Sequence, residues 1–531
     1  MNNTSLRSGV IFGILGGLVV FLFGAWSVMV IGVIIGLALG LTFGARVKEK
    51  DMLKAAQHEL VPASVAAAIL VAISLLQNFV LAPATGKVPS DIGIVIAANL
   101  IGAFGLIFFA GLTTALHALP PRQEQIGKLA LLAFLIVTFP FVDSFAGLRW
   151  TPQLIFALIF VILGLGLNIV VGYAGLLDLG YAAFFAIGAY TTGILSSPQH
   201  DIHWNFWLVI WIAAAVAGVW GLILGAPTLP LRGDYLAIVT LGFGEIVPVV
   251  FKNLTKVTIQ DPITCWILPG LFRLFGSSTT TQCLTLMRDE DLTAGERGIN
   301  PIGRPWLPII GEFQSDNPIP WYFLILAIIL LSIFLIRRLH NSRLGRAWMA
   351  IREDELAAAQ MGINPVRTKL LAFAMGATFS GFAGAFYGAY IRGIFPSVFD
   401  FSVSIIVLCT IILGGLGNIN GVIVGGLVIM GADRLFLPAL KDFLKGLMDH
   451  TVLPALASNH TLQLAVSQNA DPILYRFLLF GLTLVIMMAV RPEGLIPSAQ
   501  RRAELHAAEE LAGPTVVEAA AGTTAPEGKQ A

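Results

Sequence analysis

Few residues of this chain have the types and spacing that catalysis requires. Of its eight histidines, His200 and His203 form the close pair, and neither a cysteine nor a Glu-x-x-His pattern accompanies them. This spacing does not predict a metal site. No Gly-x-x-x-x-Gly-Lys-Ser/Thr sequence occurs, so we do not expect the chain to bind or hydrolyse ATP by itself. The sequence thus predicts no enzyme, no metal and no resident cofactor.

A short charged segment, residues 341–362, separates two strongly apolar runs. Within it one stripe of apolar residues recurs at helical spacing: Leu344, Ala347, Trp348 and Ile351. Most of the charged side chains fall elsewhere: Arg346, Arg352, Glu353 and Asp354. Asn341 or Ser342 can cap the start, and Gly362 can stop the helix. The pattern predicts one amphipathic helix over residues 343–361.

The acidic run of this helix helps to distinguish two roles for it. One alternative is a helix that lies on the lipid headgroups. Three consecutive acids would be repelled by an anionic cytoplasmic leaflet, however. We therefore favour a coupling element that is offered to a groove of a soluble protein. Its expected contact residues are Arg346, Arg352, Glu353, Asp354, Glu355 and Gly362.

Glycine-rich breaks interrupt several of the apolar runs. Small residues let helices approach closely in lipid, and packing is the simpler role for any single glycine. Glycine breaks also produce discontinuous helices, whose free backbone groups line transport sites near the bilayer midplane. The candidates for such a translocation path are Asn168, Gly172, Gly175, Thr240, Gly242, Gly244, Glu245, Gly414, Gly415 and Gly417.

Two carboxylates accompany these breaks. A carboxylate at the bilayer centre costs about 2.5–3.5 kcal/mol, so Glu245 is expected to face protein or water. Asp178 escapes this cost if it lies in a short loop on the cytoplasmic side, where the count of spans places it. A transporter driven by protons or sodium would need a relay of such carboxylates, and Glu245 is nearly alone.

Membrane helices must position these residues. The chain has 531 residues, of which 56% are hydrophobic and 12% are charged, about half the charged fraction of soluble domains. Its net charge of +1 gives no reason to expect nucleic-acid binding. With ~20 apolar residues needed per span, the predicted fold is an all-α, polytopic membrane protein. The predicted spans lie near residues 61–82, 92–117, 128–146, 153–172, 180–196, 207–227, 234–251, 321–336, 369–390, 402–416, 421–437 and 472–490.

The uncharged stretch 9–45 is too long for one ordinary span. It can form one tilted helix or a hairpin that turns near residues 24–27, and the sequence leaves both open. The tail after Arg502 has almost no large apolar side chain, so residues 498–531 are expected to be a disordered tail.

Lysine and arginine in short loops predict the orientation. They concentrate in residues 46–54 and 337–369, which the count of spans puts on one side together with the basic residues after the last span. We take that side, and the C-terminus, as cytoplasmic. Loop 252–320 then lies outside, as does loop 434–471 despite its basic residues. Cys265 and Cys283 share the first of these loops and can pair if it faces an oxidising compartment.

Five stretches make the chain resemble a known family, the permease subunits of LIV-type ABC importers of branched-chain amino acids. They run over Gly166–Tyr190, Leu231–Ile246, Leu344–Glu355, Leu413–Gly417 and Arg491–Ile496. Together they cover about residues 153–497 in the family's order. The Arg-Gly-Asp-Tyr-Leu-Ala sequence within the second stretch is similar to the M-type subunit rather than its H-type sister.

The resemblance implies a bacterial inner-membrane importer whose other parts are separate chains. These are an H-type permease subunit, two ATP-binding subunits and a periplasmic amino-acid-binding protein. It also implies that residues 343–362 contact the ATPase. The family embraces urea and short-amide permeases, which remain an alternative for the solute.

The resemblance divides the chain into five parts. They are an N-terminal membrane extension (1–150), the first part of the permease core (151–251), a periplasmic loop with an insertion at about 258–291 (252–320), the second part of the core (321–497) and the cytoplasmic tail (498–531).

Overall fold

A computed structural model describes most of the chain. The described residues are 10–17, 19–20, 27–43, 52–81, 92–147, 149–200, 203–228, 234–255, 257–260, 285–308, 311–448, 471–491 and 493–497. Cys265 and Cys283, the tail 498–531 that was expected to be disordered, and most of the insertion at about 258–291 lie outside the described residues. Contacts divide the chain into two compact units: Met1–Gln153 with Gly431–Leu479 form unit 1, and Leu154–Met430 with Phe480–Ala531 form unit 2.

The regular secondary structure of the described residues is helical apart from two short antiparallel strand pairs and one isolated bridge. The strand pairs are β1 (Val257–Gln260) with β2 (Thr285–Glu290), and β3 (Trp306–Leu307) with β4 (Gly311–Glu312). Eleven of the described helices are long and apolar enough to cross a membrane, which confirms the polytopic α-helical prediction. The predicted span 180–196 is instead a shorter helix of 16 residues, and the predicted span 421–437 continues to Gly446.

Unit 1 is built on close contacts between small residues. Its main helices are α2 (Ser27–Phe43), α3 (Met52–Leu76), α5 (Ile92–His117) and α6 (Pro121–Ala146). Unit 1 also includes helical residues 10–17 and 19–20, two π-helical turns (Gln77–Leu81 and Ala432–Phe436), α18 (Leu437–Leu447) and a 3-10 turn (Pro472–Tyr475). A Cβ added at Gly32 would lie 2.2 Å from the carbonyl oxygen of Gly102, so only glycine allows α2 and α5 to approach this closely.

The first apolar stretch folds back on itself. Helical residues occur on both sides of residues 21–26, and a Cβ added at Gly16 would meet the side chain of Ile35. A continuous helix would separate residues 16 and 35 by about 28 Å at 1.5 Å per residue. The hairpin is therefore the arrangement in this structure, rather than one tilted helix.

Unit 2 surrounds one long buried helix, α15 (Pro365–Ile391). Most of α15 is enclosed, and it packs closely on α8 (Tyr181–Ser196) and α9 (Phe206–Thr228). Around them lie α7 (Trp150–Leu167, continued by the π-helical turn η3, Asn168–Tyr173), α10 (Asp234–Asn253), α12 (Pro318–His340), α16 (Phe401–Gly414), α17 (Ile419–Gly431) and α21 (Arg476–Val490).

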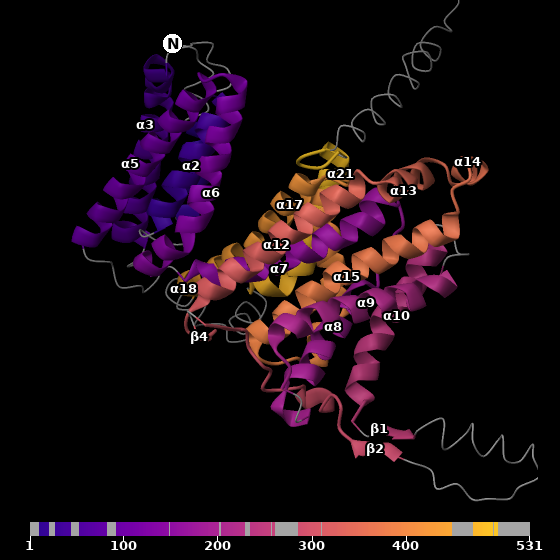
Figure 1. The fold of residues 1–531 in the computed structure, drawn as a ribbon. Coiled ribbons are helices and arrows are strands. Elements are labelled where there is room, and N and C mark those ends of the chain that lie inside the picture. The colour runs from indigo at the N-terminus through magenta and orange to yellow at the C-terminus, as the bar shows by residue number, and fades with distance from the viewer. Residues whose placement is uncertain are drawn as a thin grey trace, which may run out of the picture. The chain divides into compact units, whose positions relative to one another are not determined.

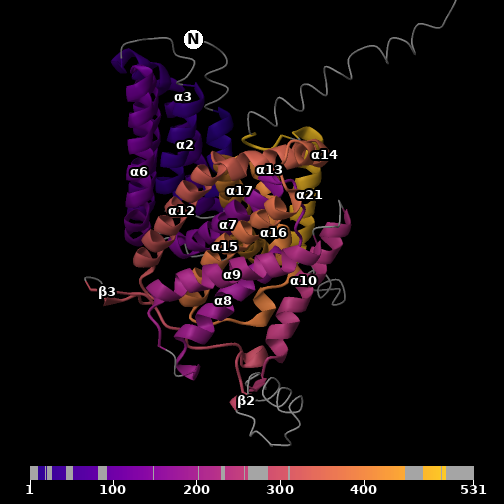
Figure 2. The same cartoon turned by 45° about the vertical axis from the view of Figure 1, so that its right-hand side comes forward.

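The two ends of unit 2 are built from different segments (Figures 1 and 2). The short helices α13 (Arg343–Glu353) and α14 (Glu355–Gln360) lie at one end, whereas β1 and β2 lie at the other. At the end with the strands, Gly303 N donates to Ser196 O at 3.0 Å, and Ile299 pairs with Ile394. At the end with α13, residues 493–497 return to the turn after α16. The segments that were predicted to share a side, 337–369 and the residues after the last span, thus share an end of unit 2.

Candidate functional site

The charged segment is two helices, and the prediction of one helix over 343–361 is wrong at Asp354. This residue has an extended backbone (φ −152°, ψ 111°) and caps both the end of α13 and the start of α14. Its Oδ1 accepts from the backbone N–H of Leu356 at 2.8 Å and of Ala357 at 3.0 Å. An aspartate side chain competes for backbone donors in this way, and it is among the best N-caps. The carboxylate of Asp354 is therefore used inside the segment.

The first helix, α13, is anchored by its apolar stripe. Trp348 is 0% exposed and its Nε1 donates to the carbonyl of Thr368 in α15 at 2.8 Å. Ile351 is buried on the same face. Ser342, rather than Asn341, caps the helix, since Ser342 Oγ accepts from Gly345 N at 3.3 Å. The predicted stripe thus faces the bundle.

Arg352 links α13 to the transmembrane helices. Its Nη1 donates to the carbonyl of Gly172, within η3, at 2.6 Å. The chain at Gly175 also lies against its alkyl stem, because a Cβ there would be 2.8 Å from Arg352 Cγ. Two predicted path glycines therefore lie beside a predicted coupling residue, and the guanidinium points into the bundle.

The other acids of the run differ in their surroundings. Glu355 forms an ion pair of 2.7 Å with Lys369, whose side chain is almost fully buried in α15. Glu353 is exposed, as are Gly362 and Arg346, and the last of these donates to the carbonyl of Asn341 at 3.0 Å. The acidic run is therefore largely part of the fold.

The tip of the segment is apolar instead. Leu356 is 65% exposed and Met361 is 84% exposed, and Val366 is exposed nearby. Gly362 follows with φ +86°, a left-handed conformation that favours glycine, and Asn364 then caps α15 through a 3.1 Å bond from Arg367 N. We call Leu356, Met361 and Val366 the apolar tip.

Asn168 joins this end of the bundle to the turn between α16 and α17. It is fully buried in η3, and its Oδ1 accepts from Gly417 N at 2.9 Å. Gly172 lies against both groups, since a Cβ there would meet Asn168 Oδ1 at 2.1 Å. The turn also holds residues 493–497, because Leu495 N donates to Leu413 O at 2.8 Å and Ile496 N to Gly414 O at 3.0 Å.

Gly415 shows why this turn contains glycines. Its φ of +116° is accessible to glycine, and a Cβ would lie 2.6 Å from the carbonyl of Ile496. Of the predicted path residues, Asn168, Gly172, Gly175, Gly414, Gly415 and Gly417 thus gather at the end of unit 2 that carries α13.

Thr240 and Gly244 gather elsewhere, against the start of α8. Thr240 Oγ1 accepts from Leu179 N at 3.1 Å, and a Cβ on Gly244 would lie 3.0 Å from the Cα of Gly180. Residues 175–180 are not helical, so the path from η3 into α8 is discontinuous. Asp178 lies in this non-helical stretch, as expected of a loop residue, but its side chain is buried: it is 1% exposed, and its Oδ1 accepts from Gly180 N at 2.9 Å.

Glu245 lies on the outer face of α10. It lines a hollow of about 520 Å³ together with Ile246, Val249 and Val250, and all four side chains are exposed. Gly242 lies on the same helix with no atom within 4 Å of a Cβ placed there. A carboxylate is thus set among apolar side chains on a face that no other described part of the chain covers.

Comparison with known proteins identifies this arrangement. Residues 153–487 match the family model of the permease component of branched-chain amino acid transport systems. The chain belongs to this permease family. It is 36% identical over 381 residues to the high-affinity branched-chain amino acid transport system permease protein LivM of Salmonella typhimurium, covering 71% of this chain and 77% of the relative. For LivM of Escherichia coli the identity is 37% over 382 residues, with the same coverage.

The permease is also similar, over a shorter stretch, to a permease protein of the H type. It is 32% identical over 133 residues to LivH of Salmonella typhimurium, covering 25% of this chain and 42% of the relative. No solved structure matches the chain. The family match begins at residue 153, where the first segment of unit 1 ends, and it includes the second segment, Gly431–Leu479. Both α13 and α14, and every predicted path residue, lie inside the match.

Some residues of this permease site escaped prediction from the sequence. The ion pair of Lys369 could have been predicted, because a lysine at the start of an apolar span is expected to have a partner. The double capping by Asp354 was harder to predict, because the only signal is that aspartate is a frequent helix cap. The bond from Arg352 to Gly172 crosses 180 residues, and no local pattern predicts it.

Proposed function

We propose that this permease is a membrane subunit of an ATP-driven importer of branched-chain amino acids. Support comes from the family match and from the names of the LivM relatives, which are branched-chain amino acid permeases. The partial identity to LivH supports an H-type permease as its partner. Two ATP-binding subunits and a periplasmic amino-acid-binding protein complete the proposed assembly in the bacterial inner membrane. ATP would be bound by the partner subunits alone.

The outer face of α10 is the proposed wall of the translocation path. Glu245 on that face would cost about 2.5–3.5 kcal/mol if it met lipid at the bilayer centre. If the H-type permease covers this face of α10 and water lies between the two subunits, Glu245 does not meet lipid and this cost does not arise. The discontinuity at residues 175–180 and the turn at Gly414–Gly417 are the proposed moving parts, since both are helix breaks beside α13.

Residues 343–366 are the proposed contact with the ATP-binding subunit. The observation that carries this proposal is an exposed apolar tip on a segment whose root is bonded to α15 and to η3. Movement of the tip would be transmitted through Trp348 and Arg352 to the helix breaks. In this proposal the acids shape the segment, and the tip enters the groove of the partner. The end of unit 2 with α13, and the C-terminus, then face the cytoplasm.

A cross-linking experiment tests the contact. Met361→Cys places a thiol on the tip. Glu312→Cys places a matched exposed thiol in β4, which precedes the end of α12 that is opposite to α13. Both variants carry Ser in place of Cys265 and Cys283, while Cys409 is buried. With a thiol–amine cross-linker in native membranes, Met361→Cys should capture the ATP-binding subunit and Glu312→Cys should not. Capture from Glu312→Cys alone would refute both the contact and the orientation.

A second experiment tests which subunit hydrolyses ATP and which solute is transported. The purified chain should hydrolyse no ATP until the ATP-binding subunits are added, because it lacks a phosphate-binding loop. Uptake of labelled leucine, with urea and a short amide as competitors, tests the solute. Turnover by the chain alone, or competition by urea at the level of leucine, would contradict the proposal.

A further inference from the structure

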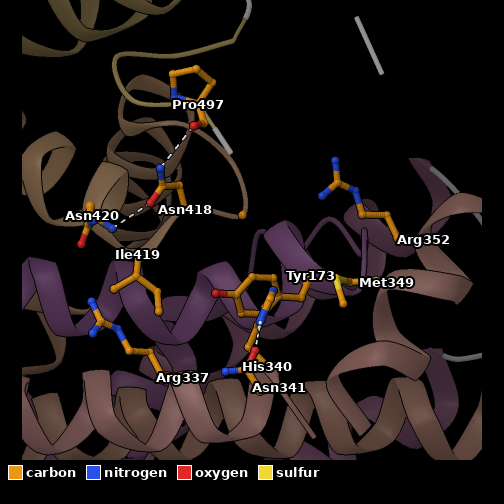
Figure 3. A pocket seen from close by; sticks show the side chains of 11 residues that line it. Tyr173, Arg337, His340, Asn341, Met349, Arg352, Asn418, Ile419, Asn420 and Pro497 are labelled. Atoms are coloured by element: carbon orange, nitrogen blue, oxygen red, sulfur yellow. Dashed lines mark hydrogen bonds between the residues drawn. The ribbon is translucent and has the colours of Figure 1, made fainter. Parts of the chain in front are cut away.

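A polar pocket of about 450 Å³ lies at the end of unit 2 that carries α13 (Figure 3). Its walls come from the end of α12, from α13, from η3, from the turn after α16 and from Pro497. The polar groups that line it include two arginines, a histidine and three asparagines: Arg337, Arg352, His340, Asn341, Asn418 and Asn420. None of the described residues that line it is a carboxylate, so the pocket favours an anion.

Arg337 is the cation that remains available in this pocket. Arg352 already donates to Gly172 O, and the His340 ring packs on Tyr173 with centroids 4.8 Å apart. Arg337 is exposed and has no hydrogen-bond or ion-pair partner among the described residues. Figure 3 shows Arg337 and Arg352 on opposite sides of the pocket, with Tyr173 between them. An arginine fork is suited to phosphate oxygens.

An apolar groove continues from the same arginine. A second hollow of about 580 Å³ shares Arg337 and Asn341 with the first, and it runs along α12 past Phe334 to Leu330. Arg338 also lines it, with its guanidinium carbon 5.5 Å from the centre of the Phe334 ring. Phe334 is 55% exposed and Leu330 is 61% exposed. Leu330 precedes Arg337 by two helical turns, which is about 10 Å toward the hydrocarbon. A free anion would fill the pocket but leave this groove empty.

We propose that an anionic phospholipid occupies the two hollows together. Its phosphate binds Arg337 in the polar pocket, and one acyl chain lies along Phe334 and Leu330. Basic pockets at helix ends on the cytoplasmic side suit such headgroups. Because α12, α13 and η3 all line the pocket, the bound lipid would hold α13 in place against the transmembrane helices. The inference rests on membrane insertion and on the orientation given under the proposed function, and it does not depend on the solute or on the ATP-binding subunits.

The test compares lipids of one acyl composition on the full chain in detergent. Phosphatidylglycerol should bind at least about tenfold more tightly than phosphatidylcholine, as measured by native mass spectrometry of delipidated protein. Arg337→Gln should reduce this preference to less than about twofold. Arg343→Gln, which removes an exposed arginine on α13 outside both hollows, should leave the preference unchanged. Equal binding of the two lipids, or equal loss in both variants, would overturn the proposal.

Two further measurements on the wild-type chain distinguish a lipid phosphate from a free anion and test the groove after assembly. Inorganic phosphate at millimolar concentration should not displace phosphatidylglycerol from the wild-type chain, and displacement would mean that the site binds free anions. The same comparison is then made on the chain assembled with its H-type partner. Retention of the phosphatidylglycerol preference supports the lipid, whereas its loss on assembly would mean that the partner's helices cover the groove.

Discussion

Residues 343–366, the proposed coupling segment, consist of two halves that differ in which side chains they bury. In α13 the apolar stripe is turned inward, and Trp348 is fully enclosed with its indole N–H bonded to α15. In the shorter α14 and the turn that follows it, Leu356 and Met361 are turned outward. Asp354 separates the halves by capping both helices. One half is thus a root and the other a tip.

This difference suits the role that we propose for the segment, which is to transmit movement of a partner subunit to the helix bundle. A tip that was also packed against the bundle would have no surface left for a partner. A root without specific bonds would let the tip move without moving the bundle. The bonds from Trp348 to Thr368 and from Arg352 to Gly172 connect the root to two different elements of unit 2. The comparison therefore predicts that substitutions in the root reduce stability, whereas substitutions in the tip reduce coupling.

Trp348→Ala should have the largest effect. Removing a fully buried tryptophan leaves a cavity and costs about 3–5 kcal/mol. A large fall in the midpoint of thermal unfolding of the detergent-solubilised chain is the expected readout. Trp348→Phe is the control, because it keeps the ring but leaves the carbonyl of Thr368 without its donor, at about 1–3 kcal/mol. If the alanine variant had the unfolding midpoint of the wild type, the claim that Trp348 anchors α13 to the bundle would be wrong.

Arg352→Gln should have the next largest effect. A hydrogen bond from a charged group contributes about 1.5–3 kcal/mol, and the variant withdraws it from Gly172 O. Because η3 also holds Asn168 and its bond to Gly417, uptake should fall together with stability. Arg352→Lys keeps the charge and one donor, and it should recover part of both. If the glutamine and lysine variants behave alike, the bond to Gly172 is not what matters.

Asp354→Ala should have a smaller effect on stability. The loss of an N-cap costs about 0.5–2 kcal/mol, and here the cap also fixes the angle between α13 and α14. Asp354→Asn retains the capping oxygen without the charge, so it distinguishes the cap from an acidic contact with the ATP-binding subunit. Near-normal uptake in the asparagine variant is expected. If the asparagine variant were as inactive as the alanine variant, the result would support the acidic contact surface that the sequence predicted.

The sequence predicted the elements better than their contacts. Spans follow from local hydropathy, so the helix positions were predictable, and the stop after α14 followed from Gly362 and Asn364. The break at Asp354 was missed because three consecutive acids fit a continuous helix as well as a capped one. The burial of Asp178 and the pairing of Glu355 with Lys369 depend on segments that are distant in sequence or close only after folding. Such contacts are set by tertiary packing, which no periodicity records.

The apolar tip should give the smallest change in stability and a clear loss of function. Exposed side chains outside special features change stability by about 0.5 kcal/mol or less, so Leu356→Ser with Met361→Ser should keep the wild-type unfolding midpoint. Uptake and stimulation of the ATP-binding subunits should nevertheless fall, because the proposed groove loses its apolar ligand. Gln360→Ser changes an exposed polar residue of the same helix and should affect neither quantity. Were the double variant to transport at the wild-type rate, the tip would be ordinary surface, and the contact with the motor would have to lie on Arg346 and Glu353 instead.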